Sequence, residues 1–206
     1  CALAEDEKTV YAGSDELIAY DTGDGEVKWA LDVNNNSPVI GTNNIIYTGN
    51  VRGRLIAVDS GGEKKWNKNV MRAPFFSYNP IVIGEGSNLY FNDFSKIYSY
   101  TNSGNKNWEY QVNGVTDVVI DKEYNKYFIE NDHNVAVLDQ NKNKKWTFAT
   151  GGPCFNTIAD NKTIYVGSFD GYIYAVNTDG SLKWYLNTGS AIIQPPVISR
   201  DGTLYV

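Results

Sequence analysis

The chain has few of the residues on which most catalytic and metal sites depend. Its 206 residues include two cysteines, one histidine and one methionine. Two cysteines, Cys1 and Cys154, cannot form a disulfide framework or a cysteine-ligated metal site. His133 stands without an activated serine or cysteine motif, and we expect it in a surface turn. The sequence offers no catalytic constellation, so we expect a protein that is not an enzyme.

Positive charge and long apolar runs are also scarce. Lys and Arg number 18 against 24 Asp and Glu, which gives a net charge of −6. Nucleic-acid binding needs clustered cations that displace counterions, so we expect no nucleic-acid partner. The densest basic run, residues 142–145, is interpreted as a solvated hairpin turn. No stretch approaches the roughly 20 apolar residues that cross a bilayer, and no signal segment is recognisable at the start.

Aromatic residues, in contrast, are plentiful and recur at one period. The five tryptophans are Trp29, Trp66, Trp108, Trp146 and Trp184. A tyrosine upstream of each keeps the same spacing, and these are Tyr11, Tyr47, Tyr90, Tyr127 and Tyr165, with Tyr205 opening a sixth set. Two markers that share one period of about 40 residues identify an internal repeat.

Each repeat contains four short apolar segments. In residues 163–184, an Asp170-Gly171 turn joins two apolar runs and an Asp179-Gly180 turn leads to Trp184. Such turns are a strong hairpin signal and are expected to place both central residues at positive φ. Both faces of YIYAV, residues 172–176, are apolar, so both faces need a cover. Antiparallel units of this length are typical of propeller blades, whereas a parallel solenoid lacks antiparallel hairpins.

We therefore expect an all-β protein, a β-propeller of four-stranded antiparallel blades with five whole repeats and two strands of a sixth. In this single segment, residues 1–206, the repeats span approximately 1–31, 32–69, 70–112, 113–149, 150–187 and 188–206. The chain begins inside a first strand and ends inside a second. We expect part of a larger ring, or self-association through open blade faces; a closed ring of five blades plus a two-stranded sixth is the alternative.

The tryptophans are assigned a structural docking role. Ala57 and Ala175 precede Trp66 and Trp184 by nine residues, and a small residue on one blade is expected to leave room for a ring from another. Glycines suited to positive φ stand four residues before four of the tryptophans. These are Gly25, Gly62, Gly104 and Gly180. The fourth repeat has Lys142 at this place, so its turn is expected to differ.

This pattern of a small residue, Asp or Asn, Gly and Trp, with YVGSFDGYIYAV before it, resembles the tryptophan-docking repeat of PQQ-like propellers. These belong to the quinoprotein alcohol dehydrogenase-like superfamily. The resemblance covers all 206 residues and is specific for the fold. It says little about function, because the same repeat occurs in quinone dehydrogenases, in the assembly lipoprotein BamB and in receptor-kinase ectodomains. We place the chain in a BamB-like, non-catalytic branch, in the bacterial cell envelope or outside the cell.

In the quinone dehydrogenases of this superfamily, the cofactor lies between a tryptophan and a disulfide of two adjacent cysteines, beside a calcium ion. This sequence has no adjacent cysteine pair, and its tryptophans all fall at the docking position. The resemblance therefore carries over no catalytic, cofactor-binding or metal residue, and we expect no cofactor. Asp21, Asp24 and Glu26 resemble a calcium loop, but their spacing fails the EF-hand pattern and a hairpin turn explains them.

Cys1 is open to three interpretations. It falls at nearly the same phase of its repeat as Cys154, and a disulfide between them requires Cα atoms within about 7 Å. A lipid anchor at Cys1, as in BamB, is the second. We favour the third, a free buried thiol at Cys154 and an arbitrary start at Cys1.

The longest connection between repeats, residues 67–80, is the candidate partner-binding loop. It holds residue types enriched at interface hot spots, which are Met71, Arg72, Phe75, Phe76 and Tyr78. The alternative is that Phe75 and Phe76 pack into the first strand of the third blade. We expect a binding or scaffold module for a protein or cell-surface partner. The alternatives are a fragment of a PQQ- and calcium-dependent quinoprotein dehydrogenase and the sensor ectodomain of a membrane receptor or kinase.

Overall fold

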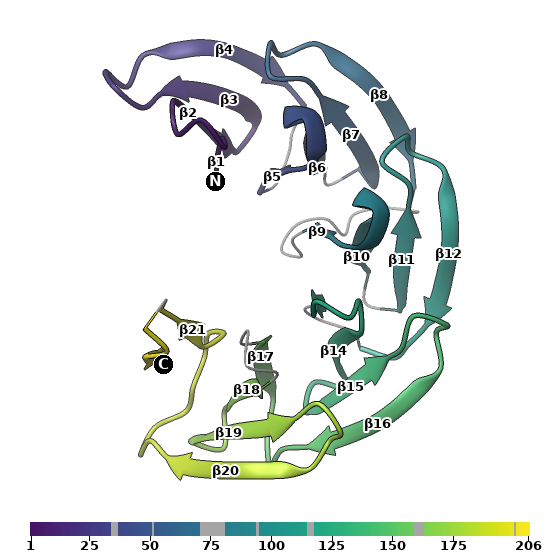
Figure 1. Ribbon diagram of the computed structural model, residues 1–206, viewed down its shortest axis with the longest axis vertical. Helices are drawn as coiled ribbons and strands as arrows, with labels where there is room; N and C mark the ends of the chain where they lie inside the picture. Colours follow the sequence, from purple (N-terminus) through teal and green to yellow (C-terminus); the bar gives the residue numbers. More distant parts are fainter. Residues whose placement is uncertain are drawn as a thin grey trace. The chain divides into compact units, whose positions relative to one another are not determined.

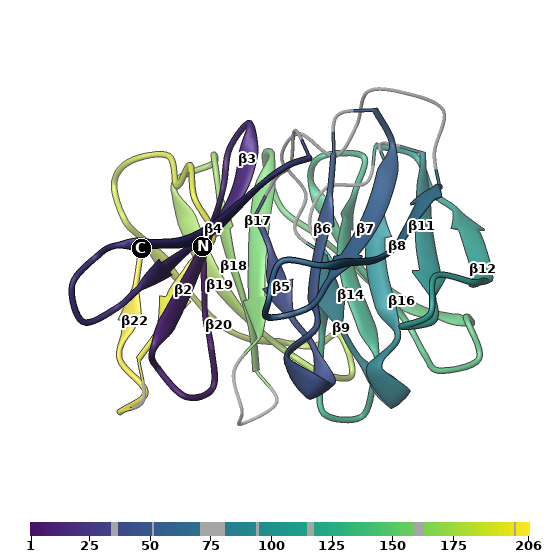
Figure 2. The ribbon, with the colours of Figure 1, turned by 90° about the horizontal axis from the view of Figure 1, so that it is seen from above.

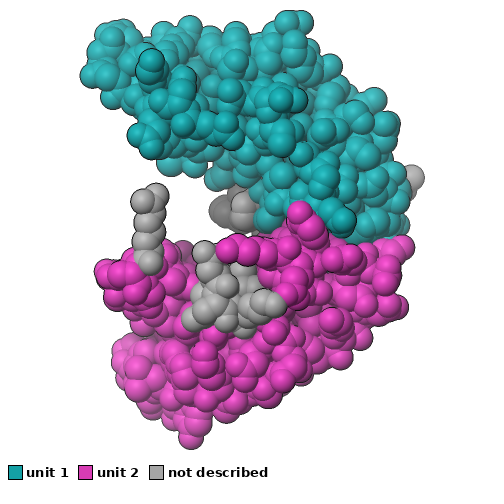
Figure 3. Space-filling view, viewed as in Figure 1, with its two compact units in different colours: residues 1–93, 97–109 teal, residues 94–96, 110–206 magenta. Residues whose placement is uncertain are grey.

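A computed structural model describes residues 1–33, 37–50, 52–70, 81–93, 95–114, 118–158, 163–199 and 201–206. The chain divides into two compact units, which are described separately below (Figure 3). Unit 1 comprises residues 1–93 and 97–109, and unit 2 comprises residues 94–96 and 110–206. The five candidate residues of the long loop, Met71, Arg72, Phe75, Phe76 and Tyr78, lie outside the described residues.

Unit 1 holds most of three four-stranded antiparallel sheets (Figure 1). The first consists of β1 (Ala2–Leu3), β2 (Thr9–Gly13), β3 (Glu16–Asp21) and β4 (Val27–Asp32). The second consists of β5 (Val39–Ile40), β6 (Ile46–Gly49), β7 (Arg54–Val58) and β8 (Lys64–Asn69). The third consists of β9 (Val82–Ile83), β10 (Leu89–Asn92), β11 (Lys96–Tyr100) and β12 (Lys106–Gln111). Short 3-10 turns, η1 (Thr42–Asn44) and η2 (Glu85–Ser87), follow β5 and β9.

Unit 2 holds two further four-stranded sheets and one two-stranded sheet. The fourth sheet consists of β13 (Val118–Ile120), β14 (Lys126–Glu130), β15 (Asn134–Leu138) and β16 (Lys144–Ala149). The fifth consists of β17 (Cys154–Ile158), β18 (Thr163–Ser168), β19 (Tyr172–Asn177) and β20 (Leu182–Asn187). The last pairs β21 (Val197–Ile198) with β22 (Leu204–Tyr205).

In every four-stranded sheet the strands lie in chain order, each paired with the next. Figure 2 shows the ribbon from a second direction. This meander confirms the all-β fold of propeller blades, and we number the blades one to five in chain order. Because the central strands carry apolar residues on both faces, neighbouring blades pack against each other within a unit. Three buried clusters lie between blades one and two, two and three, and four and five. Among the described residues, no helix is long and apolar enough to cross a membrane.

The predicted hairpins are confirmed, but their turn type differs from the expected one. Gly171 and Gly180 adopt positive φ (86° and 88°) and donate their N–H groups to the carbonyls of Ser168 and Asn177. Asp170 is not among the described residues with positive φ. Its carboxylate instead accepts the N–H of Tyr172 at 3.0 Å. The aspartate therefore caps the turn through its side chain, and only the glycine needs the left-handed conformation.

The expectation that the turn of the fourth repeat differs is wrong. Lys142 adopts a φ of 68°, and its N–H donates to the carbonyl of Asp139 at 3.1 Å. Gly62 makes the same bond to Asp59 at 3.0 Å in the second blade. The hairpin geometry thus places a lysine in a conformation that costs it roughly 1–2 kcal/mol relative to glycine.

Candidate interaction surface

Trp29, Trp66 and Trp146 each belong to a blade that is followed by another blade of the same unit. All three tryptophans are docked in the same way. The indole Nε1 of Trp29 donates to the Ser60 carbonyl at 2.8 Å. Trp66 donates to the Asn102 carbonyl at 3.0 Å, and Trp146 to the Thr178 carbonyl at 2.9 Å. Each acceptor lies in the outer turn of the next blade, two residues before the positive-φ glycine. The docking role of these tryptophans therefore includes a specific hydrogen bond.

The glycines of those turns make the room for the rings. A Cβ atom on Gly62 would lie 2.9 Å from the ring of Trp29, and one on Gly180 would lie 2.8 Å from that of Trp146. Real Cβ atoms do not approach so closely, because such contact is strongly repulsive. The same glycines supply positive φ, so one residue meets two requirements.

Ala57, one of the small residues, lies between two aromatic residues of its own blade. Ala57 lies opposite Trp66 within the β7–β8 pair and opposite Tyr47 within the β6–β7 pair. The ring of Trp66 crosses over Ala57 to reach that of Tyr47, with centroids 5.9 Å apart. The alanine therefore makes room for the tryptophan of its own blade. Blade four replaces the alanine with Val137.

Trp184 of blade five departs from this pattern. Its ring rests on Tyr165 in the usual way, with centroids 5.8 Å apart. Yet the side chain is 38% exposed, and within the described part of the chain no acceptor is found for its indole N–H. Leu186 on the same strand is 60% exposed. Among the described residues, no outer turn caps Trp184 in the way that Trp29, Trp66 and Trp146 are capped.

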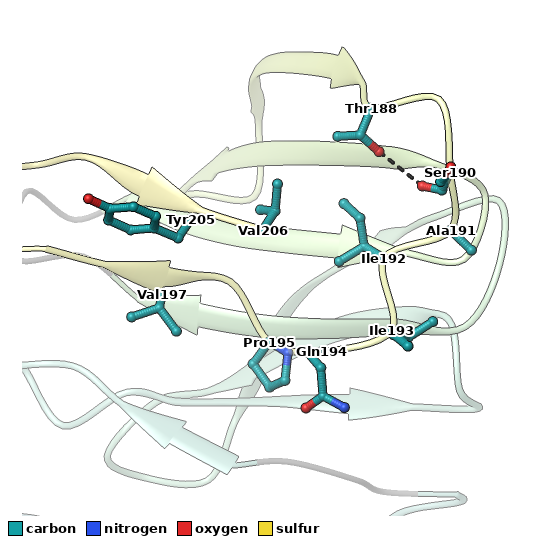
Figure 4. Close-up of a pocket in the computed structure, with 10 residues that line it drawn as sticks. All are labelled: Thr188, Ser190, Ala191, Ile192, Ile193, Gln194, Pro195, Val197, Tyr205 and Val206. Carbon is teal, nitrogen blue, oxygen red and sulfur yellow. Dashed lines mark hydrogen bonds between the residues drawn. The ribbon is translucent and has the colours of Figure 1, made fainter.

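Further exposed apolar side chains follow Trp184 and Leu186 in the chain. Among the described residues, they come from the β20–β21 connection and the two-stranded sheet, and they are Ile193, Val197, Tyr205 and Val206. We call these six residues the β20–β22 surface. A pocket of about 470 Å³ is lined by residues 188 and 190–195 and by Val197, Tyr205 and Val206 (Figure 4). Large apolar patches on a protein surface mark sites of interaction.

The connection into blade five is held by a half-buried polar cluster at Asp170. Its carboxylate accepts the N–H of Gly151 at 2.7 Å and the hydroxyl of Tyr174 at 2.7 Å. Burial opposes the charge, but these hydrogen bonds and that from the Tyr172 N–H lower the pKa of Asp170. Burial and the bond to Asp170 raise the pKa of Tyr174 to about 12. The cluster thus links the connection that follows blade four to the β18–β19 turn and strand β19 of blade five.

Replacing Asp170 with asparagine is expected to destabilise the protein by about 1–3 kcal/mol at pH 7, because the amide nitrogen would face donors that now meet a carboxylate. A lowered folded-state pKa contributes stability above the unfolded pKa of about 3.9, and that stability is lost as the pH falls through the folded value. The gap between wild type and Asp170→Asn should therefore shrink below about pH 4. Urea midpoints at pH 7 and pH 3 measure it. A gap that stays constant or widens in acid contradicts the role of the charge.

A second, polar pocket of about 230 Å³ lies in unit 1. Arg52, Arg54 and Lys64 line it beside Asp32. The buried side-chain amide of Asn50 donates to the Val33 carbonyl and accepts the N–H groups of Arg52 and Arg54. These three hydrogen bonds hold the turn between β6 and β7.

The residues that resemble a calcium loop and the single histidine both lie in turns. Asp21 accepts the N–H of Gly23 at 2.8 Å and pairs with Lys28 at 2.9 Å, as a turn residue does. His133 lies in the exposed turn between β14 and β15. Within the described ranges, no group of three or more His, Cys, Asp or Glu residues could hold a metal ion.

Both cysteines are free, with Cys1 exposed and Cys154 buried. Burial raises the pKa of the Cys154 thiol to about 11, so it is protonated at neutral pH and is a poor nucleophile. Sequence reasoning did not find the β20–β22 surface. The only signal was the apolar run AIIQPPVI, residues 191–198, directly after a docking tryptophan.

Comparisons with known proteins agree with this blade architecture. None of the curated proteins matches the sequence. Among solved structures, BamB from Moraxella catarrhalis is 14% identical with a TM-score of 0.65, covering 96% of this chain and 78% of its own. A protein of unknown function from Bacteroides caccae is 13% identical with a TM-score of 0.64, covering 95% and 80%.

A catalytically inactive virginiamycin B lyase from Staphylococcus aureus, solved with quinupristin, is 13% identical with a TM-score of 0.72, covering 94% of this chain and 70% of its own. At such identities these likenesses show the fold alone. A family model, however, matches residues 2–147, which is more than half of the chain. The tryptophan-docked blades thus belong to a known sequence family, and the chain is a member of the one described as outer membrane protein assembly factor BamB.

Proposed function

We propose that the protein is a non-catalytic propeller module that binds a protein partner at the bacterial cell envelope. The observation that carries this proposal is the match of residues 2–147 to the family model. Eight of the eleven exposed large apolar side chains among the described residues lie between Leu182 and Val206. An apolar concentration of this kind is costly in water and is stabilised when a partner covers it.

Two further observations support the proposal. The family description names an assembly factor of outer membrane proteins, which is a role in bringing proteins together at the envelope. Each tryptophan packs on the tyrosine of its own blade, with ring centroids 5.7 to 6.0 Å apart. These rings are committed to blade packing, which argues against a role in stacking on a quinone. The quinoprotein and sensor alternatives draw no specific support from the described residues.

Site-specific photocrosslinking tests this proposal in cells that naturally express the protein. A photoreactive phenylalanine analogue at Leu186 or Val197 should form a discrete adduct that mass spectrometry identifies as a protein. The analogue at Asn141, an exposed residue in the outer turn of blade four, is the matched control and should give none. The proposal is wrong if positions 186 and 197 give no adduct, or only the pattern seen at position 141.

A further inference from the structure

The polar pocket of unit 1 gathers positive charge in a protein that is acidic as a whole. Arg52, Arg54 and Lys64 line it, together with one carboxylate, that of Asp32. All four groups are charged at neutral pH. Three positive charges and one negative charge leave the pocket with a surplus of two, whereas the whole chain carries −6.

The charges of this pocket are not neutralised by one another. Within the described residues, Asp32 lies in no ion pair, and no hydrogen bond or ion pair of the Arg52 and Arg54 guanidinium groups is found. The Lys64 ammonium donates to the backbone carbonyl of Asp32 at 3.5 Å, which is a long bond. The cationic donors that line the pocket can therefore bind an anion.

The turn that carries the two arginines is held by its own hydrogen bonds. The side-chain oxygen of Asn50 accepts the N–H groups of Arg52 and Arg54, and its backbone carbonyl accepts that of Gly53. The backbone donors of residues 52–54 are thus used inside the turn, and an anion would be bound by side chains. A fixed turn keeps the two arginines near each other before any ligand arrives, which lowers the entropy lost on binding.

Blade five fills the corresponding positions with side chains of its own. Ile56 holds the strand position of Tyr174, next to the alanine that lies opposite the tryptophan. Arg52 holds the turn position of Asp170, directly before a glycine with positive φ. In blade five the Tyr174 hydroxyl donates to the Asp170 carboxylate at 2.7 Å. Blade two has a smaller apolar side chain in place of the tyrosine and a cation in place of the carboxylate, so the polar pocket is a departure from the repeat.

We propose that this pocket binds the phosphate group of a phosphate monoester. Such a group carries a charge of about −1.5 to −2 at neutral pH, which matches the surplus of two, whereas one carboxylate would match half of it. Guanidinium groups bind phosphate through paired, charge-assisted hydrogen bonds. The volume of about 230 Å³ is below the roughly 300–1,000 Å³ of pockets for drug-sized ligands, so it suits a small charged group. The inference goes beyond the proposed function and does not depend on it.

Isothermal titration calorimetry of the complete 206-residue protein with glycerol 3-phosphate tests the inference. Saturable binding at one site is expected. Lys64→Gln should weaken it about tenfold, the loss expected for one charge-assisted hydrogen bond. Lys65→Gln is the matched control, because Lys65 neighbours Lys64 on β8 and pairs instead with Asp59 and Glu63. It removes the same charge from the protein and should leave the affinity unchanged.

The other charged residues of the pocket give effects of opposite sign. Arg52→Gln and Arg54→Gln should each weaken binding at least about tenfold, because each removes a charged donor. Asp32→Asn should strengthen binding about fivefold, since it removes the negative charge that would repel the phosphate. A gain of affinity cannot come from a misfolded variant, so Asp32→Asn also controls for folding.

Vesicles distinguish a lipid phosphate from a soluble one. Cosedimentation with phosphatidic acid in phosphatidylcholine vesicles, lost in Lys64→Gln and kept in Lys65→Gln, would assign the phosphate to a lipid. Binding of glycerol 3-phosphate without cosedimentation would assign it to a soluble ligand.

Three outcomes would overturn the phosphate site. The first is the absence of saturable binding by glycerol 3-phosphate. The second is an equal loss of affinity in Lys64→Gln and Lys65→Gln, because the effect would then come from the overall charge of the protein. The third is tighter binding of a peptide with two adjacent aspartates than of glycerol 3-phosphate, because the pocket would then recognise the carboxylates of a polypeptide.

Discussion

Gly180→Ala is expected to lower the free energy of unfolding by about 2–4 kcal/mol. The residue has a φ of 88°, a conformation that costs an L-residue roughly 1–2 kcal/mol. The added Cβ would also lie 2.8 Å from two ring carbons of Trp146, and overpacking of this kind costs about 1–3 kcal/mol. The loss is large beside a total stability of about 5–15 kcal/mol. Urea denaturation followed by far-ultraviolet circular dichroism measures it.

Gly25→Ala is the control that separates the two causes. Gly25 has a φ of 79° in the outer turn of blade one, but nothing lies within 4 Å of the position that a Cβ would take there. It should therefore show only the conformational cost, about 1–2 kcal/mol. Equal losses for Gly25→Ala and Gly180→Ala would show that the tryptophan ring does not need the space over the glycine.

Trp66→Ala is expected to cost about 3 kcal/mol or more, the lower part of the range for deleting a buried tryptophan. The ring packs on Tyr47, contacts Gly104 of blade three and donates its N–H to the Asn102 carbonyl. Its deletion removes apolar contact on both sides and leaves a cavity between two blades. The same urea titrations measure the change. Trp66→Phe removes the indole N–H and shrinks the ring, so it should cost at least the roughly 1 kcal/mol of one hydrogen bond.

Trp184→Ala provides the comparison, because this tryptophan has the tyrosine contact without the covering turn. We expect a loss well below that of Trp66→Ala, of about 1–2 kcal/mol, since much of the ring already contacts water. A loss at position 184 as large as that at position 66 would mean that the next blade contributes little to docking.

The strands and their order were predictable from the sequence. The tyrosine and tryptophan markers recur once per blade, and the hairpins between Thr163 and Trp184 lie where the Asp-Gly turns indicated. These features depend on neighbours in the chain. Alternating apolar residues select a strand and a glycine selects a tight turn, whatever the rest of the molecule does.

The turn chemistry was predicted less well. Asp170-Gly171 was expected to supply two positive-φ residues, and only the glycine adopts that conformation. The difference lies in the side chain of Asp170, which bonds to the N–H groups of Tyr172 and Gly151. Gly151 lies in the connection from the preceding blade, 19 residues away. A dipeptide pattern cannot show that a third segment takes part in the turn.

The sequence by itself therefore determined the repeat and its four strands. It also determined that every tryptophan occupies the same position in its blade. Only the tertiary structure decided which tryptophans are capped and which face is open. The caps of Trp29, Trp66 and Trp146 come from residues 31, 36 and 32 positions away, on the next blade. Trp184 carries the same local signals but meets no such turn among the described residues. The physical reason is that a docked tryptophan ring contacts two blades, its own and the next. The sequence motif around the tryptophan describes only its own blade.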